Sequence, residues 1–281
     1  MELKRMRSLW GVEAPLEEAL PDFKTRGYQG IEVAVIFTPE LENLAALCKD
    51  QNLEVIAQIL TAFPGTPRTP KAHLQALKAQ VELARPLEPI LFNVQGGCDS
   101  WSELEQDQFY DAALRYASTL EAPLAFETHR GQPTFTPWTT ARILQAFPEM
   151  RLTCDLSHWV NVCERLLEDQ EDNIRLAAQH CIHIHVRVGY EEGPQVTDPS
   201  APEFATHLTA HEQWWEWMWE AQMARGQQFS TLTPEFGPPG YQHTLPFSGE
   251  PVGQLDAICN WMAEKQLHHF NFWKSSIEIS Q

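Results

Sequence analysis

The sequence has no long apolar run and no closely spaced pair of cysteines. No stretch approaches the roughly 18 apolar residues of a membrane-spanning helix, and the basic start Met1–Arg7 is not followed by the apolar segment of a signal peptide. The 6 cysteines are scattered without a CxxC spacing, which argues against a zinc finger or a disulfide framework. We therefore expect a cytoplasmic protein with reduced thiols and no membrane contact.

Positive charge is also scarce. The chain has 20 lysines and arginines against 38 aspartates and glutamates, which gives a net charge of −18. Nucleic-acid-binding domains typically carry a basic patch, and phosphate backbones repel an acidic chain. We predict that the protein does not bind nucleic acid. The acidity itself indicates no partner, because solubility accounts for it.

A glycine-rich phosphate fingerprint is missing after the first expected strand, which argues against a dinucleotide-binding fold. The chain instead alternates short apolar segments with helical patterns, several of which begin at a capping residue such as Thr69 or Ser102. The expected strands are residues 8–12, 30–37, 53–60, 89–94, 124–128, 152–156, 181–188 and 229–236. Such an alternation over 281 residues predicts an α/β protein with a single (β/α)8 TIM barrel domain, residues 1–281.

Three features interrupt this regular pattern. Pro21 lies inside the first helical pattern and is expected to kink or split that helix. Residues 190–211 contain three prolines and little periodicity, and they follow the seventh strand at the end of the barrel where active sites lie. Because long loops in compact domains are usually functional, we predict a lid-like insertion here.

The third feature is an aromatic run, Trp214–Trp219, with tryptophans nearly all round its helix. One face of this helix is expected to pack on the barrel. The other would be exposed unless the lid or a second subunit covers it, and we favour a contact in a homo-oligomer.

The seventh strand carries polar side chains on one face. Read with a period of two, Cys181, His183, His185 and Arg187 point one way, while isoleucines and valines point the other. A buried parallel strand is normally apolar on both faces. The pattern therefore indicates either a half-exposed antiparallel strand or a strand that binds something inside the barrel.

Three other strands carry a carboxylate in the same phase near their C-terminal ends: Glu127, Asp155 and Glu235. With His185 these residues occupy four consecutive strands. Converging carboxylates repel one another unless a positive charge lies between them. A mixed oxygen and nitrogen ligand set suits manganese, magnesium, cobalt or zinc, so the pattern predicts one divalent ion per chain.

These motifs resemble those of the xylose isomerase-like barrels, which include tagatose epimerase, hydroxypyruvate isomerase and endonuclease IV. The resemblance lies in FETH, CDLSHW, HIHV and PEFG, and in GYQGIEV before the second strand. It implies a metal centre, with manganese favoured, held by Glu127, Asp155, His185 and Glu235. It also implies that Glu127 and Glu235 are the acid and base, and that His158 contacts the substrate.

The seventh strand departs from this family pattern. Many relatives end it with His-x-Lys-Asp, whereas this chain has Arg187 in place of the lysine. Because an arginine does not act as a general base at neutral pH, we expect Arg187 to anchor a substrate oxygen or carboxylate. His129, on the same face as Glu127, is a further candidate for substrate binding.

The resemblance implies a sugar or sugar-acid isomerase or epimerase that moves a proton through an enediolate. A metal-dependent dehydratase or lyase of a polyhydroxy substrate shares the first proton abstraction and stays open. A non-catalytic sugar-binding barrel also stays open. Cleavage of phosphodiesters by an endonuclease IV-like centre is less favoured, because residues 30–37, 53–60 and 89–94 contain no histidine and residues 190–211 contain no Asp-x-His.

Overall fold

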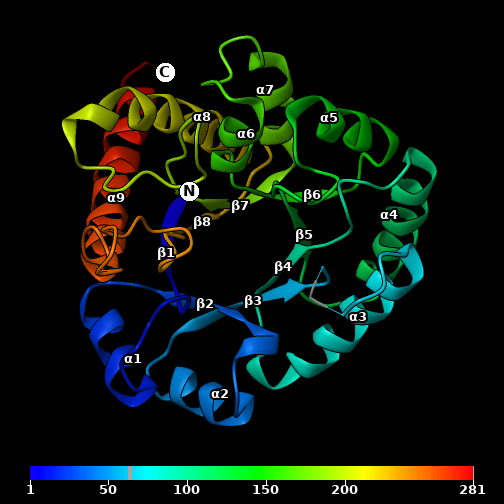
Figure 1. The fold of residues 1–281 in the computed structure, drawn as a ribbon, viewed down its shortest axis with the longest axis horizontal. Helices are drawn as coiled ribbons and strands as arrows, with labels where there is room; N and C mark the ends of the chain where they lie inside the picture. The colour runs from blue at the N-terminus through cyan, green and yellow to red at the C-terminus, as the bar shows by residue number, and fades with distance from the viewer. Residues whose placement is uncertain (63–64, 281) are drawn as a thin grey trace.

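The computed structural model describes residues 1–62 and 65–280. Eight parallel strands form a closed barrel in chain order, and β8 pairs with β1. Helices surround this ring of strands (Figure 1), so the predicted (β/α)8 barrel is confirmed. The strands are β1 (Glu2–Ser8), β2 (Gly30–Ala34), β3 (Glu54–Leu60), β4 (Leu91–Gln95), β5 (Leu124–Glu127), β6 (Arg151–Cys154), β7 (Cys181–His185) and β8 (Phe229–Thr233).

The α-helices are α1 (Leu16–Thr25), α2 (Leu41–Asp50), α3 (Pro70–Leu83), α4 (Glu103–Ala117), α5 (Pro137–Ala146), α6 (Ser157–Cys163), α7 (Glu171–His180), α8 (Ala205–Ala224) and α9 (Leu255–Ser280). Short 3-10 helices are η1 (Val35–Phe37), η2 (Arg85–Leu87) and η3 (Pro202–Phe204). Thr69 caps α3, and Ser102 forms a capping box with Glu105, as predicted. α1 runs through Pro21 without a break. None of the described helices has both the length and the apolar character of a membrane span.

The prediction for the first strand was wrong, because β1 is Glu2–Ser8 and not residues 8–12. Its sequence is rich in charge, yet its two arginines are buried and Lys4 is partly buried. Arg7 is 1% exposed and stacks on Phe23 of α1, while Lys4 pairs with Glu54 inside the barrel at 2.6 Å. Long cationic side chains bury their apolar stems in this way, so hydropathy alone did not reveal the strand.

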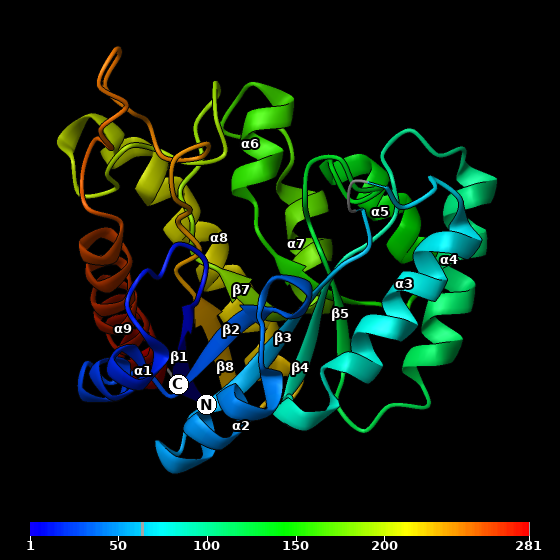
Figure 2. The ribbon, with the colours of Figure 1, turned by 60° about the horizontal axis from the view of Figure 1, so that its bottom comes forward.

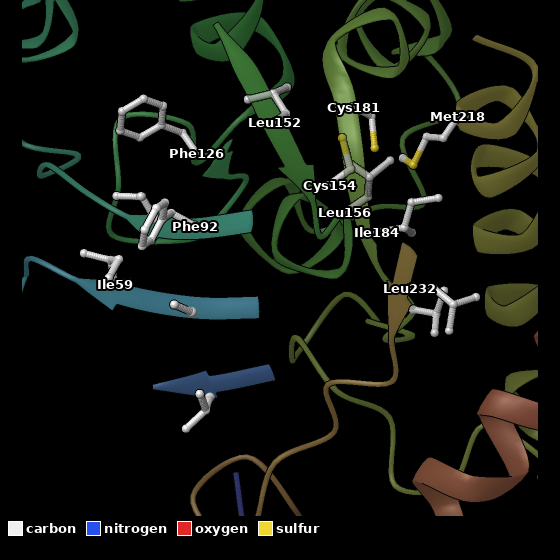
Figure 3. Close-up of a cluster of buried hydrophobic side chains, with 14 of the residues drawn as sticks. Ile59, Phe92, Phe126, Leu152, Cys154, Leu156, Cys181, Ile184, Met218 and Leu232 are labelled. Carbon is white, nitrogen blue, oxygen red and sulfur yellow. The ribbon is translucent and has the colours of Figure 1, made fainter. Parts of the chain in front are cut away.

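The main core lies between the strands and the surrounding helices. Figure 3 shows part of it, where Cys154 and Cys181 lie together near Met218 of α8. Cys181 was predicted to share the face of His183 and His185. The pairing of β7 with β6 shifts register at this point, so Cys181 packs outside the barrel and the histidines face inward. Such a bulge inverts the simple alternation of side chains.

The connection from β7 to α8 is shorter than predicted, because residues 205–211 belong to helix α8. Its middle is packed against the barrel end. The Gln195 amide donates to the carbonyl of Gly237 and accepts from the amide of Gly237, at 3.1 and 2.7 Å. The N-terminus and the C-terminal end of α9 lie at the other end of the barrel (Figure 2). A lid function for the connection from β7 to α8 stays a prediction.

Helix α8 buries most of its aromatic run inside the chain. Trp214, Trp215 and Trp219 are at most 4% exposed. Trp217 lies under the guanidinium of Arg175 at 4.1 Å from the ring centre. This packing within one chain accounts for the tryptophans. They therefore no longer argue for a contact between two copies, and a homo-oligomer stays a prediction.

Candidate metal centre and adjoining cavity

Four ligand-type side chains meet inside the barrel at the C-terminal ends of four consecutive strands. Glu127 ends β5, Asp155 directly follows β6, His185 ends β7, and Glu235 lies two residues after β8. One ligand atom from each lies within 4.8 Å of all the others. The sequence-predicted set is therefore brought together by the structure.

The distances around His185 are those of a compact ligand set. Its Nδ1 lies 3.1 Å from Oε2 of Glu235, 3.6 Å from Oδ2 of Asp155 and 3.7 Å from Oε1 of Glu127. Ligands that bind an ion at about 2.0–2.3 Å have mutual separations of roughly 3–3.7 Å. In the described structure, Nδ1 of His185 and Oε1 of Glu127 are buried without a hydrogen-bond partner. The residues therefore fit a divalent cation.

Local structure holds Asp155 in place. Its Oδ1 accepts hydrogen bonds from the backbone amide and the hydroxyl of Ser157, at 3.1 and 2.5 Å, in the turn that begins α6. Its Oδ2 accepts from Arg187 at 2.5 Å. The Asp-x-Ser spacing thus orients the carboxylate locally, and Arg187, two residues after β7, supplies its counter-charge.

Arg187 is 1% exposed, and protein acceptors take its N–H groups. Besides Asp155, it donates to Nε2 of His158 at 2.6 Å, to the hydroxyl of Ser157 at 3.2 Å and to the carbonyl of Glu235 at 3.1 Å. Its Nη1 also lies 3.5 Å from the Glu235 carboxylate. A guanidinium has five N–H donors, so this network leaves little capacity for the substrate carboxylate that sequence reasoning assigned to it.

The titration of these groups reflects excess negative charge. Burial and the neighbouring carboxylates Glu235 and Asp155 raise the pKa of Glu127 to about 8. Burial opposes a charge on His185, but Glu235, Glu32 and Glu127 outweigh it and raise the pKa of that imidazole well above its usual value. Burial also acts to raise the pKa of Asp155, but Arg187 and His185 lower it to about 2. The centre thus favours an added positive charge, whether a proton or a cation.

Sequence reasoning missed Glu32. This carboxylate lies on β2 in the barrel interior and is 1% exposed. It accepts hydrogen bonds from His183, His185, Asn93 and Thr233. A sequence signal for it was available. In GIEVA the small residues Gly30 and Ala34 share a face with Glu32, which leaves room for a carboxylate on the inner side of the strand.

Amide side chains orient the two glutamates. Asn93 and Gln95 donate to Oε2 of Glu127 at 3.0 and 3.1 Å, and Gln58 donates to Oε1 of Glu235 at 2.8 Å. These bonds leave Oε1 of Glu127 and Oε2 of Glu235 directed to His185. Each glutamate is therefore fixed by one oxygen and presents the other to the centre.

His129 and His158 form a pair beside the centre, with ring centroids 3.9 Å apart. Burial lowers the pKa of His129 to about 4, and Arg187 acts in the same direction. Burial, His129 and Arg187 hold the pKa of His158 well below its usual value, so both rings are neutral near pH 7. His158 uses Nε2 to accept from Arg187. The structure therefore places both predicted substrate contacts near the centre, but His158 is committed to a protein partner.

A cavity of about 480 Å³ opens above these residues. Its polar lining includes Glu235, Gln58, Gln95, His129 and Arg187, and its aromatic lining includes Trp10, Phe37 and Tyr241. The rings of Trp10 and Tyr241 meet edge to face at 4.9 Å. A cavity of this size, with aromatic walls and few converging polar groups, suits a small polar molecule.

The solved structures most relevant to this geometry have the same barrel. The chain shares the (β/α)8 barrel fold of these structures. A D-allulose 3-epimerase from Methylomonas sp. is 13% identical, with a TM-score of 0.62 over 95% of this chain and 98% of the other. A probable 3-DHS dehydratase from Bacillus anthracis is 13% identical, with a TM-score of 0.59 over 94% and 98%.

An endonuclease IV from Thermus thermophilus is 12% identical, with a TM-score of 0.54 over 85% of this chain and 94% of the other. No protein-family model and no curated protein matches the sequence. Identities this low establish the fold alone. Solved proteins with this fold include epimerases, a dehydratase and endonucleases, so the fold does not identify a function, which must be argued from the site.

Proposed function

We propose that the protein is a divalent-metal-dependent isomerase or epimerase of a neutral sugar, which moves a proton through an enediolate intermediate. The convergence of Glu127, Asp155, His185 and Glu235 beside a cavity of about 480 Å³ supports this proposal most directly. Proton abstraction next to a carbonyl needs a positioned base and stabilisation of the developing negative charge. Both requirements have candidates in this cluster.

All four residues of the cluster would hold the ion. When bound there, a divalent ion supplies chelation of adjacent substrate oxygens and makes the neighbouring C–H more acidic. Manganese is the favoured ion, and magnesium, cobalt or zinc also suit the ligand set.

Glu127 and Glu235 are the proposed acid and base. Glu235 lines the cavity, and its carboxylate is oriented by Gln58. Glu127 is held by Asn93 and Gln95 through Oε2, which leaves Oε1 facing the centre. The two carboxyl groups come from different strands, which suits proton transfer on two sides of one carbon.

The choice of a neutral substrate follows from the charges that line the cavity. Among the described residues of this lining, Arg187 is the one arginine or lysine, and its donors are occupied by Asp155, His158, Ser157 and Glu235. His129 is neutral at physiological pH. A substrate carboxylate or phosphate would meet acidic neighbours without a free cation from the protein. A sugar acid is therefore less favoured than an unmodified sugar.

A dehydratase or lyase is the second candidate, since it shares the first proton abstraction. It also needs a group that protonates the departing hydroxyl. His129 lines the cavity, but its Nδ1 donates to the carbonyl of Arg130 at 2.5 Å, so Nε2 is left as a proton acceptor. This arrangement favours isomerisation or epimerisation.

An endonuclease is disfavoured by the same charges and by the histidine pattern. The described segments of β2, β3 and β4 place Glu32, Gln58, Asn93 and Gln95 inside the barrel and supply no histidine ligand. We propose that the protein acts on small molecules and does not cleave duplexes that contain abasic sites.

The test is incubation of manganese- or magnesium-loaded protein with neutral ketoses in heavy water, followed by NMR. Exchange of a carbon-bound proton together with the appearance of an epimer or aldose would support the proposal. The matched uronic and aldonic acids should react at least tenfold more slowly. Release of water with formation of an unsaturated product would identify a dehydratase, and binding without exchange of any substrate would identify a non-catalytic barrel.

A further inference from the structure

Below the candidate metal centre, the barrel interior contains a buried carboxylate with its own set of partners. Glu32 on β2 is 1% exposed. The Nε2 atom of His185 lies 3.1 Å from each of its oxygens, and Nε2 of His183 lies 3.1 Å from Oε2. Asn93 donates to Oε1 at 2.9 Å, and the hydroxyl of Thr233 donates to Oε2 at 2.6 Å.

These contacts account for the carboxylate in the barrel interior. A buried carboxylate is costly unless its oxygens are hydrogen-bonded or paired with charge. Glu32 accepts from donors on β4, β7 and β8, so its position is fixed from several sides of the barrel. A group held this firmly can in turn fix a neighbour that is otherwise free to rotate.

That neighbour is His185, whose two nitrogens face different partners. Nε2 meets both oxygens of Glu32, and Nδ1 faces Glu127, Asp155 and Glu235. In the neutral ring, which is the form that binds a cation, a proton on Nε2 that is donated to Glu32 leaves the lone pair of Nδ1 pointing at the centre. The alternative tautomer would place a proton at the centre and two unprotonated acceptors, Nε2 and the carboxylate, against each other.

We propose that Glu32 is a positioning residue that fixes the orientation and tautomer of His185 and thereby raises the affinity of the centre for a divalent cation. The proposal rests on the metal centre of the proposed function, but it requires no particular sugar reaction. Hydrogen-bonded partners of ligating histidines typically change metal affinity by about 10–100-fold.

Glu32→Gln is the informative variant because it keeps the size of the side chain. A glutamine has one acceptor oxygen and an amide that donates, so it cannot accept from all four of the present donors. Where the amide faces Nε2 of His185, the imidazole must rotate or move its proton to Nδ1. The expected result is a fall of about 10–100-fold in zinc affinity, measured by competition with a chromophoric chelator.

Glu54→Gln is the matched control, because it also removes one carboxylate from the inner face of the barrel. Glu54 lies on β3, where it pairs with Lys4 and does not contact the described ligand residues. It should bind zinc within threefold of the unmodified protein. An equal loss in both variants would show that Glu32 acts only through net charge and would overturn the positioning role.

His183→Gln separates His185 from the other imidazole on Glu32. His183 also bonds the hydroxyl of Thr231 at 2.7 Å and does not join the set of four ligands. If Glu32 acts through His185, His183→Gln should retain most of the zinc affinity. A loss as large as that of Glu32→Gln would assign the effect to the whole buried network and overturn the proposal.

A measurement on the unmodified protein is independent of whether any variant folds. Nitrogen-15 NMR of histidine-labelled, zinc-loaded protein should show His185 bound through Nδ1 and protonated at Nε2. Coordination through Nε2 would overturn the proposal. Failure of the unmodified protein to bind zinc or manganese would overturn the proposed function as well. Normal binding with the expected variant effects, but no sugar turnover, would reject only the proposed function.

Discussion

The guanidinium of Arg187 donates to the carboxylate of Asp155 over 2.5 Å, and both side chains are buried. The same guanidinium contacts His158 and Glu235, so it joins three of the groups around the candidate metal centre. Arg187 therefore acts as the built-in counter-charge of the acidic cluster. Its acceptors lie on several segments, so a lysine would not serve, since one ammonium has three donors and no planar fork.

Replacing Arg187 with methionine should strongly destabilise the metal-free protein. Removing one partner of a buried ion pair typically costs about 3–5 kcal/mol, because the other charge stays buried without compensation. A divalent cation near Asp155 and Glu235 would restore part of this loss. Denaturant unfolding in a chelator and in manganese should therefore show a larger stabilisation by manganese in Arg187→Met than in the unmodified protein.

Arg165→Met is the control, because it removes an arginine that pairs at the surface with Asp169, four residues further along the chain. Exposed pairs of this kind contribute little. It should change neither the stability nor the response to manganese appreciably. An Arg187→Met protein as stable as this control would mean that Arg187 is not the counter-charge.

The pH dependence of stability should contain a contribution from His211, which is 0% exposed. Its Nδ1 donates to the carbonyl of His207 at 2.8 Å, and its Nε2 accepts from the amide of Gly189 at 3.3 Å. Burial lowers its pKa to about 4. Above the unfolded value near 6.5 the ring is neutral in both states. As the pH falls from about 6.5 toward 4, the unfolded state binds the proton first and stability is lost, by up to roughly 3 kcal/mol.

His211→Gln should therefore flatten the stability profile between pH 6.5 and about 4. Chemical denaturation at several pH values in this range would measure the change in slope. His268→Gln, at an exposed position, provides the comparison. An unchanged slope in His211→Gln would show that other groups dominate the acid sensitivity.

Much of the site follows from the sequence because period-two alternation and strand order are local properties. Glu127, Asp155, His185 and Glu235 share a phase at the ends of consecutive strands, and a closed barrel must bring such residues together. The fold was predictable for the same reason. The predicted strand boundaries were less accurate, as the misplaced first strand shows.

The remaining features depend on contacts between distant strands. Glu32 lies in an apolar segment, and only its hydrogen bonds to β4, β7 and β8 give it a role. Cys181 changes face because of a register shift, which pairing with β6 determines. Arg187 was expected to bind substrate, but its acceptors lie on neighbouring segments that alternation does not identify.

The metal content of the purified protein should be close to one divalent ion per chain. Asp155→Ala and His185→Ala each remove a ligand and should lose most of this ion. Elemental analysis after gel filtration measures the ratio. Three ions per chain would instead favour a trinuclear centre of the endonuclease type. If the protein binds no ion even after metal is added, the proposal of a metal-dependent enzyme is wrong.

The two glutamates should separate metal binding from proton transfer. In Glu127→Gln and Glu235→Gln the side chain keeps its size and one carbonyl oxygen, so metal affinity should fall only in part. The basic oxygen is lost, and general base catalysis typically supplies a factor of about 10²–10⁴. Turnover at saturating metal should therefore fall by about that factor in each variant.

An epimerase that uses one glutamate on each side of the carbon should also show asymmetry between its variants. With one epimer as substrate, one variant should still exchange the substrate proton in heavy water without completing the inversion. The other variant should not remove the proton from that epimer. With the opposite epimer this preference should reverse, because each glutamate then meets the other face. Proton exchange followed by NMR at matched metal occupancy measures both. Near-normal exchange and turnover in both variants would mean that the glutamates serve only as ligands, and His129, which lines the cavity with a free Nε2, would become the first candidate for the base.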